Sequence, residues 1–328
     1  MKHIFLDANI LLDFYRYGSD DLSQVEKLLA LMEGEEIVIY SNQLLRDEVN
    51  RGREAELSHS FEALRKFKFE LKLPNYCSDL AEVNPLLESL KKANQNHSNL
   101  VQVVQTKLYN KTLAADKLIT KLFEKTVDIK ITPTLLERAT QRQQFNNPPR
   151  KRKDSIGDSL HWESLLSVER VSRLNLISRD SDFASEIKPA ELKDFLHSEW
   201  IEAHGNMAQV NLYNSLVGFF KVDYPSMKLS EETEKNTLIS QLAASPNFAT
   251  THSLVEELSK FDFYTNGQAA KLFTVFAENQ QVNWIGQDED VNKFFIGLQA
   301  QAYLAPVEYC DLIAAMLGVD ESEFFLPF

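Results

Sequence analysis

The 328-residue chain has little of what stabilises small secreted proteins or anchors proteins in membranes. It contains two cysteines, Cys77 and Cys310, which lie far apart in sequence. Such a low number excludes a disulfide scaffold and a cysteine-based zinc site. No apolar run approaches the roughly 18 residues that would span a bilayer, so we expect no membrane contact. A strand is predicted directly at the N-terminus, which leaves no room for a signal peptide and predicts a cytoplasmic location.

Glycine-rich turns are also missing. The chain has only 10 glycines, and no glycine-rich turn follows a predicted strand. Dinucleotide-binding and P-loop signatures are therefore absent. The seven histidines form no pair with the spacing of metal ligands, and we interpret His161 as a structural residue.

Basic residues are outnumbered by acidic ones, 35 against 48, and the resulting net charge of −13 disfavours nucleic-acid binding. Nearly all of this negative charge lies at the C-terminal end. Residues 229–328 hold 4 Lys and Arg against 15 Asp and Glu, or −11, whereas residues 1–228 hold 31 against 33, or −2. Within this nearly neutral part, the run from Arg150 to Lys153 is predicted to contact phosphates. The alternative is that these side chains are ordinary solvated surface.

The N-terminal segment carries the clearest pattern. The apolar run Ile4-Phe5-Leu6 ends at Asp7, and Asn9 precedes a second apolar run. The pattern predicts a buried strand that presents Asp7 at its carboxyl end, where open α/β sheets place site residues. The alternative is that Asp7 or Asn9 only caps the following helix.

Three further segments place acids in the same way. The run Leu174–Ile177 is followed by Ser178 and Asp180, and the basic run precedes a helix with Asp158 in its first turn. A strand at 37–40 leads into a helix that carries Glu48. These acids could converge on one edge of a parallel sheet. Clustered carboxylates repel each other, and hard divalent cations are the natural means of neutralising them.

Together, these segments resemble the PIN-domain (PIN-like) family of metal-dependent nucleases, which includes many prokaryotic toxins. The resemblance rests on FLDANILLDFYR, RDEVNR, SIGDSLHWE and LISRDSDF, in that order, and covers about residues 1–228. It implies an α/β fold with a parallel sheet flanked by helices. It also implies a metal-dependent endoribonuclease that uses Mg²⁺ or Mn²⁺, of a toxin or defence type.

The resemblance assigns roles residue by residue. Catalytic and metal-binding roles fall on Asp7, Glu48, Asp158 and Asp180, with Asn9 and Ser178 as polar supports. Asp154 and Asp182 are extra acids that could take over the metal-binding roles of Asp158 and Asp180. The residues expected to bind nucleic acid are Arg51, Arg150, Lys151, Arg152, Lys153 and Arg179.

The length of the chain and the interruptions in its helical pattern predict two domains. The first is a nuclease domain over 1–228, with a helical insertion at about 61–145. Within it, helices are expected at 20–32, 41–59 and 189–199, and an edge strand at 209–213. A linker near 223–230 would lead to an acidic, all-helical domain over 229–328. We expect that domain to regulate or recruit, through a protein partner or by self-association.

Other functions remain open. One alternative is a structure-specific DNA nuclease of the kind that cuts flaps, and single-stranded DNA is a separate alternative to RNA as the bound nucleic acid. Another is a non-catalytic scaffold with a degenerate site, although all four matched acids are present. Phosphatases of the haloacid type and response-regulator receivers fit poorly, because they need paired acids that this order of residues does not supply. RNA is preferred from the resemblance alone, since no residue here indicates recognition of a 2′-hydroxyl.

Overall fold

The computed structural model describes residues 1–16, 22–77, 80–149, 156–169 and 171–325. These residues form a parallel sheet of five strands in the order β3-β2-β1-β4-β5. The strands are β1 (Lys2–Leu6), β2 (Ile37–Ser41), β3 (Val127–Asp128), β4 (Arg173–Ile177) and β5 (Gln209–Tyr213). The predicted α/β class and parallel sheet are confirmed. β3 was not expected, since its two residues are too short to leave an apolar pattern.

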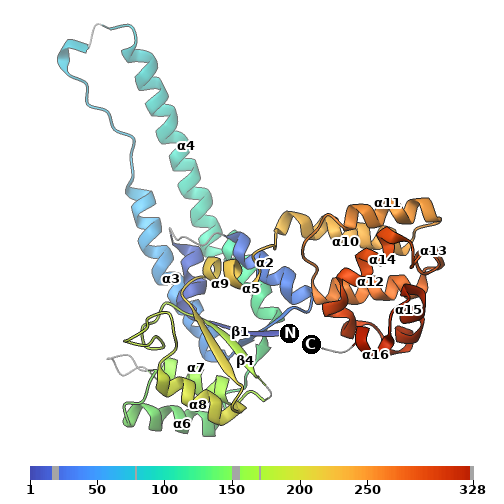
Figure 1. The fold of residues 1–328 in the computed structure, drawn as a ribbon. Helices are drawn as coiled ribbons and strands as arrows, with labels where there is room; N and C mark the ends of the chain where they lie inside the picture. Colours follow the sequence, from blue (N-terminus) through green and yellow to red (C-terminus); the bar gives the residue numbers. More distant parts are fainter. Residues whose placement is uncertain (17–21, 78–79, 150–155, 170, 326–328) are drawn as a thin grey trace.

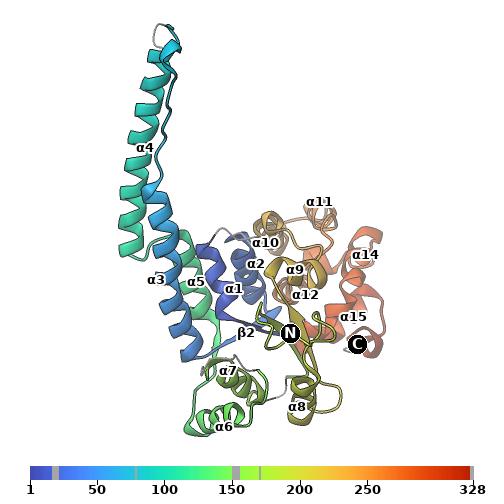
Figure 2. The same ribbon diagram turned by 90° about the vertical axis from the view of Figure 1, so that its left-hand side faces the viewer.

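Helices cover both faces of the sheet, as Figures 1 and 2 show. α1, α2, α5 and α9 lie on one side, and α6, α7 and α8 lie on the other. Their bounds are α1 (Ala8–Leu12), α2 (Leu22–Glu33), α5 (Ala114–Lys125), α6 (Pro133–Gln144), α7 (Gly157–Leu166), α8 (Asp194–His204) and α9 (Leu216–Asp223). The helix expected at 189–199 therefore begins and ends five residues later.

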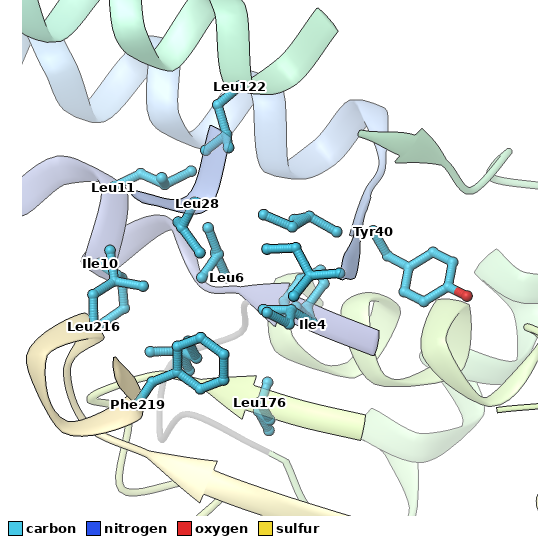
Figure 3. Close-up of a cluster of buried hydrophobic side chains, with 14 of the residues drawn as sticks. Ile4, Leu6, Ile10, Leu11, Leu28, Tyr40, Leu122, Leu176, Leu216 and Phe219 are labelled. Atoms are coloured by element: carbon cyan, nitrogen blue, oxygen red, sulfur yellow. The ribbon is translucent and has the colours of Figure 1, made fainter. Parts of the chain in front are cut away.

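The core forms because the central strands are apolar on both faces, as strands covered by helices on both sides must be. Ile4, Phe5 and Leu6 of β1 are at most 1% exposed. Figure 3 shows Ile4 and Leu6 among side chains from α1, α2, α5, β4 and α9. β1 is therefore the rigid centre of the sheet, and the residue that follows it is held firmly in place.

Between β2 and α5 the chain leaves the body as a long arm, visible at the top of Figures 1 and 2. The arm consists of the outer part of α3 (Gln43–Lys66), the connecting residues 67–77 and 80–82, and α4 (Val83–Tyr109). α3 begins after Asn42, whose side chain accepts a hydrogen bond from the backbone N–H of Leu45. The expected helix at 41–59 therefore starts later and continues further than predicted. At the base of the arm, burial raises the pKa of the Asp116 carboxyl, but hydrogen bonds from Arg53 and Tyr15 outweigh this and lower it overall.

The C-terminal region is all-helical, with its own cluster of buried apolar side chains. Its helices are α10 (Leu229–Ala243), α11 (Phe248–Leu258), α12 (Asn266–Glu278), α13 (Gln280–Asn283), α14 (Glu289–Gly297), α15 (Cys310–Leu317) and α16 (Glu321–Phe324). Short 3₁₀ turns complete the fold at Asp13–Tyr15, Asn75–Cys77, Gln299–Leu304 and Val307–Tyr309. Among the described residues, no helix is both long and apolar enough to cross a membrane.

The C-terminal helices pack directly on the part of the chain that contains the sheet. The backbone N–H of Gly267 donates to the carbonyl of Gly34 at 2.8 Å, and that of Asn266 donates to Glu36 at 2.6 Å. A side chain at Gly34 would lie 2.5 Å from Thr265, so this approach requires glycine. The segment at 223–228 packs against the first core, where Tyr224 and Met227 are buried, and the linker expected near 223–230 stays a prediction. The proposed domain boundary at 228 stays a prediction.

Candidate metal centre

The carboxyl ends of three adjacent strands meet at one edge of the sheet. Leu6 of β1 pairs with Ile177 of β4, so Asp7 and Ser178 follow directly after paired residues. On the other side, Phe5 pairs with Tyr40 of β2, which places Asn42 at the same edge. Chain order reverses direction between β1 and β4, and such a switch point is where open α/β sheets bind ligands. Asp7 and Ser178 therefore lie at the carboxyl edge of the sheet, as the sequence pattern predicted for them.

Asp7 is held by side chains rather than used as a helix cap. Its carboxylate makes no capping hydrogen bond to α1. Instead, Oδ2 accepts hydrogen bonds from Asn9 Nδ2 at 2.8 Å and from the hydroxyl of Ser178. Asp7 is 6% exposed, so its carboxylate is both desolvated and fixed. The capping alternative is wrong for Asp7.

The same two polar residues connect Asp7 to the next acid. Ser178 Oγ accepts from the backbone N–H of Asp180 at 3.0 Å, and Asn9 Oδ1 accepts from that of Arg179 at 3.3 Å. A further turn forms where the N–H of Asp182 donates to Asp180 Oδ1 at 3.2 Å. Asn9 and Ser178 therefore tie the end of β1 to the loop after β4.

Three acids from two segments come together beside this loop. Asp158, Asp180 and Asp182 each offer a carboxylate oxygen, and these oxygens lie within 4.8 Å of one another. Asp158 is buried in the first turn of α7, while the other two are half-buried. Carboxylates at this separation repel strongly when burial removes water, so the arrangement favours a bound cation. Asp182 thus stands with Asp158 and Asp180 in this cluster; Asp154 lies outside the described residues.

Glu48 reaches the site through a histidine. Its Oε2 lies 2.9 Å from Nε2 of His161, which is 1% exposed and sits one turn after Asp158 on α7. Residues three apart on a helix lie on the same side, so Glu48 is linked to the side of α7 that carries Asp158. The opposite ring nitrogen, Nδ1, lies 3.2 Å from Asn42 Nδ2. Glu48 is not part of the three-acid group found among the described residues.

The basic residues differ in their surroundings. Arg51 is exposed on α3, one turn after Glu48. The guanidinium of Arg179 forms an ion pair with Asp13, which is 1% exposed and also lies 3.6 Å from Arg16. Arg179 is therefore held at the rim by a buried acid. The run from Arg150 to Lys153 lies outside the described residues.

Two of the residues that hold the site in place were not anticipated from the sequence. Asn42 stands directly after β2, the same position that Asp7 and Ser178 take after their strands, and this signal could have identified it. Asp13 carries no comparable signal, since an acid within an apolar stretch gives no indication of an arginine far along the chain. A cavity of about 980 Å³ lies elsewhere, against Lys2 at the opposite end of β1 and the C-terminal helices. Its distance from the acids makes it no part of this site.

Comparison with known proteins agrees with the geometry. The family model described as PIN domain matches residues 4–183, which is more than half of the chain. The matched range contains the ends of β1, β2 and β4 and the whole acid cluster. No curated protein and no solved structure matches the chain.

Proposed function

Because the chain belongs to the PIN domain family, whose members are typically metal-dependent nucleases, we propose that it is a metal-dependent endoribonuclease. The observation that carries the proposal is the cluster of Asp158, Asp180 and Asp182, with ligand oxygens within 4.8 Å of one another. Ser178 connects Asp7 to the loop that carries Asp180, and His161 connects Glu48 to the helix that carries Asp158, which supports a role for both acids at the same site. A toxin or defence role is part of the same proposal and rests on the resemblance.

The donor set fits Mg²⁺ or Mn²⁺, which prefer carboxylate oxygens. Oxygens within 4.8 Å of one another can share one such ion, since each would stand about 2.0–2.6 Å from it. Asp158, Asp180 and Asp182 would hold the cation, with Asp7 and Glu48 completing the negative surroundings. When bound, the metal supplies an activated water and stabilises charge on the leaving oxygen.

The protein's own part in the reaction is to position groups and exclude water. Buried Asp7 and Asp158 keep a fixed orientation, which removes the reorganisation that free carboxylates would need. Arg179, held by Asp13, would place a phosphate at the rim of the site. We assign the same role to exposed Arg51 and to Arg150, Lys151, Arg152 and Lys153.

Two other functions follow from the same site. A structure-specific DNA nuclease would use the same acids on flap or single-stranded DNA. A scaffold with a degenerate site would keep the fold without cleavage, but intact Asp7, Glu48, Asp158 and Asp180 argue against it. For the acidic region 229–328 we propose a regulatory or recruiting role, in which it would act on the nuclease, bind a basic partner or pair two chains. A cytoplasmic location stays a prediction.

A cleavage assay tests the nuclease proposal. Purified full-length chain with Mn²⁺ is expected to cut single-stranded RNA, to lose activity with EDTA, and to leave flap DNA largely intact. Asp158→Asn is expected to abolish cleavage, because it removes a ligand charge in the first turn of α7. The matched control is Asp194→Asn, since Asp194 is exposed in the first turn of α8. Preferential cutting of flap DNA would favour the second function, and no metal-dependent cleavage of either substrate would favour the scaffold.

A further inference from the structure

The arm exposes an unusually large amount of apolar surface to solvent. Ten large hydrophobic side chains between 67 and 109 are more than 40% exposed: Phe67, Phe69, Leu71, Tyr76, Leu80, Leu86, Leu87, Leu100, Val103 and Tyr109. None of the 27 residues of α4 is fully buried. Contiguous apolar patches of more than a few hundred Å² usually mark interaction sites.

One side of α4 is already used within the arm. Asn94 accepts a hydrogen bond from the backbone N–H of Phe69 at 3.1 Å and donates to its carbonyl at 2.9 Å. The His97 ring packs against Phe67 and Phe69, with ring centroids 6.0 and 6.2 Å apart. The returning connection therefore covers the side of α4 that carries Asn94 and His97. It leaves Leu86, Leu100 and Val103 exposed.

We propose that the exposed apolar surface of the arm, on α4 and on the connection, is the interface with a second copy of the chain. The area is sufficient. A whole aromatic side chain has roughly 150–250 Å² of surface, and the four rings of the arm are 41–82% exposed, so together they offer several hundred Å². With the six aliphatic residues, the apolar surface is of the order of the roughly 800 Å² per partner that a stable interface buries.

The charge of the arm also fits a copy of itself better than a nucleic acid. Residues 62–109 carry seven Lys and Arg against five Asp and Glu, so their charges nearly balance. α4 itself carries Glu88 and three lysines in 27 residues, and its other polar residues are mainly Asn, Gln and Ser. Such a helix lacks the concentrated positive charge of a phosphate-binding surface, and two copies would repel each other only weakly. The arm projects from the body in both views, so arms paired about a two-fold axis would leave the acid cluster open.

Sedimentation velocity of the full-length chain tests this interface. The wild type is expected to form a concentration-dependent dimer in the micromolar range or tighter. Leu86→Glu with Leu100→Glu is expected to weaken dimerisation about 100-fold or more, since each change buries a charge in place of an apolar side chain. The control pair is Ile187→Glu with Val307→Glu, which changes residues that are 87% and 86% exposed outside the arm.

Circular dichroism and RNA cleavage show whether the arm variant still folds. A wild type that stays monomeric at high concentration would overturn the proposal, as would a folded arm variant that dimerises like the wild type. A monomeric wild type that binds a different protein through Leu86 and Leu100 would also overturn it, because the occupant would then be another chain.

A second inference comes from the hydrogen bonds around His161 and rests on the proposed role of Glu48. Asn42 Oδ1 accepts from Leu45 N–H at 2.9 Å, so Nδ2 is the atom that faces His161. An amide N–H₂ only donates, and Nδ1 of the ring must therefore accept. In the neutral ring, Nε2 then carries the hydrogen and donates to Glu48 at 2.9 Å.

From this geometry we infer that Asn42 and His161 are positioning residues for Glu48. Asn42 sets the tautomer of a buried ring, and the ring orients one oxygen of Glu48 while leaving the other available to the cation. Residues that orient metal ligands in this way typically contribute 10–100-fold to metal affinity.

The test compares two variants of His161. His161→Leu removes the donor and is expected to weaken Mn²⁺ binding about 10–100-fold in a titration followed by electron paramagnetic resonance. His161→Gln keeps an N–H donor and is expected to recover most of the affinity. In the wild type, ¹⁵N spectra of the metal-free chain are expected to show hydrogen on Nε2.

Hydrogen on Nδ1, or equal Mn²⁺ affinity in the folded Leu variant, would overturn the inference. If the wild type binds no Mn²⁺ at all, the proposed metal site fails. In that case the ¹⁵N spectrum still decides whether Asn42 sets the tautomer of His161.

Discussion

Asp7→Asn and Asp180→Asn are each expected to reduce RNA cleavage about 10³-fold or more while leaving the metal-free fold at least as stable as the wild type. Loss of a carboxylate charge weakens the cation site, and metal assistance accounts for several kcal/mol of the reaction barrier, at about 1.4 kcal/mol per factor of ten. Without metal, the same loss relieves repulsion among the acids. Asparagine at position 7 can still accept the hydrogen bonds from Asn9 and Ser178.

Thermal unfolding with and without Mn²⁺ separates the two effects. Saturating Mn²⁺ is expected to raise the Tm of the wild type, because a ligand that binds only the folded state stabilises that state. The Tm of the two variants is expected not to rise. Asp13→Asn is the matched control, since Asp13 is also buried near the N-terminus but forms an ion pair with Arg179. It is expected to lower the Tm in the absence of metal. Unfolding of Asp7→Asn well below the wild type in metal-free buffer would show that Asp7 is a structural residue.

The sequence predicted the edge of the sheet but not the connections across it. β1 and β4 are apolar runs that end at a polar residue, and this local pattern is enough to place Asp7 and Ser178. The link from Glu48 to His161 joins residues 113 positions apart, and it depends on how α3 and α7 pack. Hydrophobic periodicity describes each helix separately, so it could not show that His161 faces an acid.

The arm shows the same limit in its geometry. Helical periodicity over 61–145 predicted a helical insertion, and α4, α5 and α6 lie within it. Residues 67–74 after α3 form neither helix nor strand, and Asn94 of α4 hydrogen-bonds both the N–H and the carbonyl of Phe69 in this stretch, a contact that helical periodicity does not show. In the same way, the sequence indicated an interruption between helices near 223–228, but it did not indicate that this segment packs against Lys2. Lys2 pairs with Asp223 at 2.8 Å and lies over the ring of Tyr224.

An ion triad around the buried Arg142 joins α6, α7 and α8. Arg142 of α6 is 5% exposed and donates to Glu163 of α7 at 2.8 Å. It also donates to both oxygens of Glu199 of α8, at 2.9 and 2.8 Å. Burial alone would lower the pKa of the Arg142 guanidinium, but the hydrogen bonds with Glu199 and Glu163 raise it overall. The triad therefore holds together the three helices on one face of the sheet, including the one that carries Asp158 and His161.

Arg142→Met is expected to destabilise the domain that contains the sheet by about 3–5 kcal/mol, because it leaves the buried carboxylate of Glu163 and the half-buried carboxylate of Glu199 without their cation. At roughly 2–4 °C per kcal/mol for a domain of this size, the Tm should fall by about 6–20 °C. Trp162 and Trp200 pack against each other in this region, with ring centroids 5.8 Å apart, so tryptophan fluorescence in urea reports the transition. Arg138→Met, which changes an exposed arginine one turn earlier on α6, is expected to shift stability by only about 0.5 kcal/mol.

A triple variant separates the charge of the triad from its packing. Arg142→Met with Glu163→Gln and Glu199→Gln removes all three charges and keeps an acceptor for the indole N–H of Trp162, which donates to Glu199 at 2.9 Å. Buried ion groups replaced as a set often cost little, whereas one removed from its partners costs much. The triple variant should therefore recover a large part of the stability lost in Arg142→Met. Equal or greater loss in the triple variant would mean that Arg142 stabilises α6, α7 and α8 mainly by filling space between them, and not by neutralising Glu163 and Glu199.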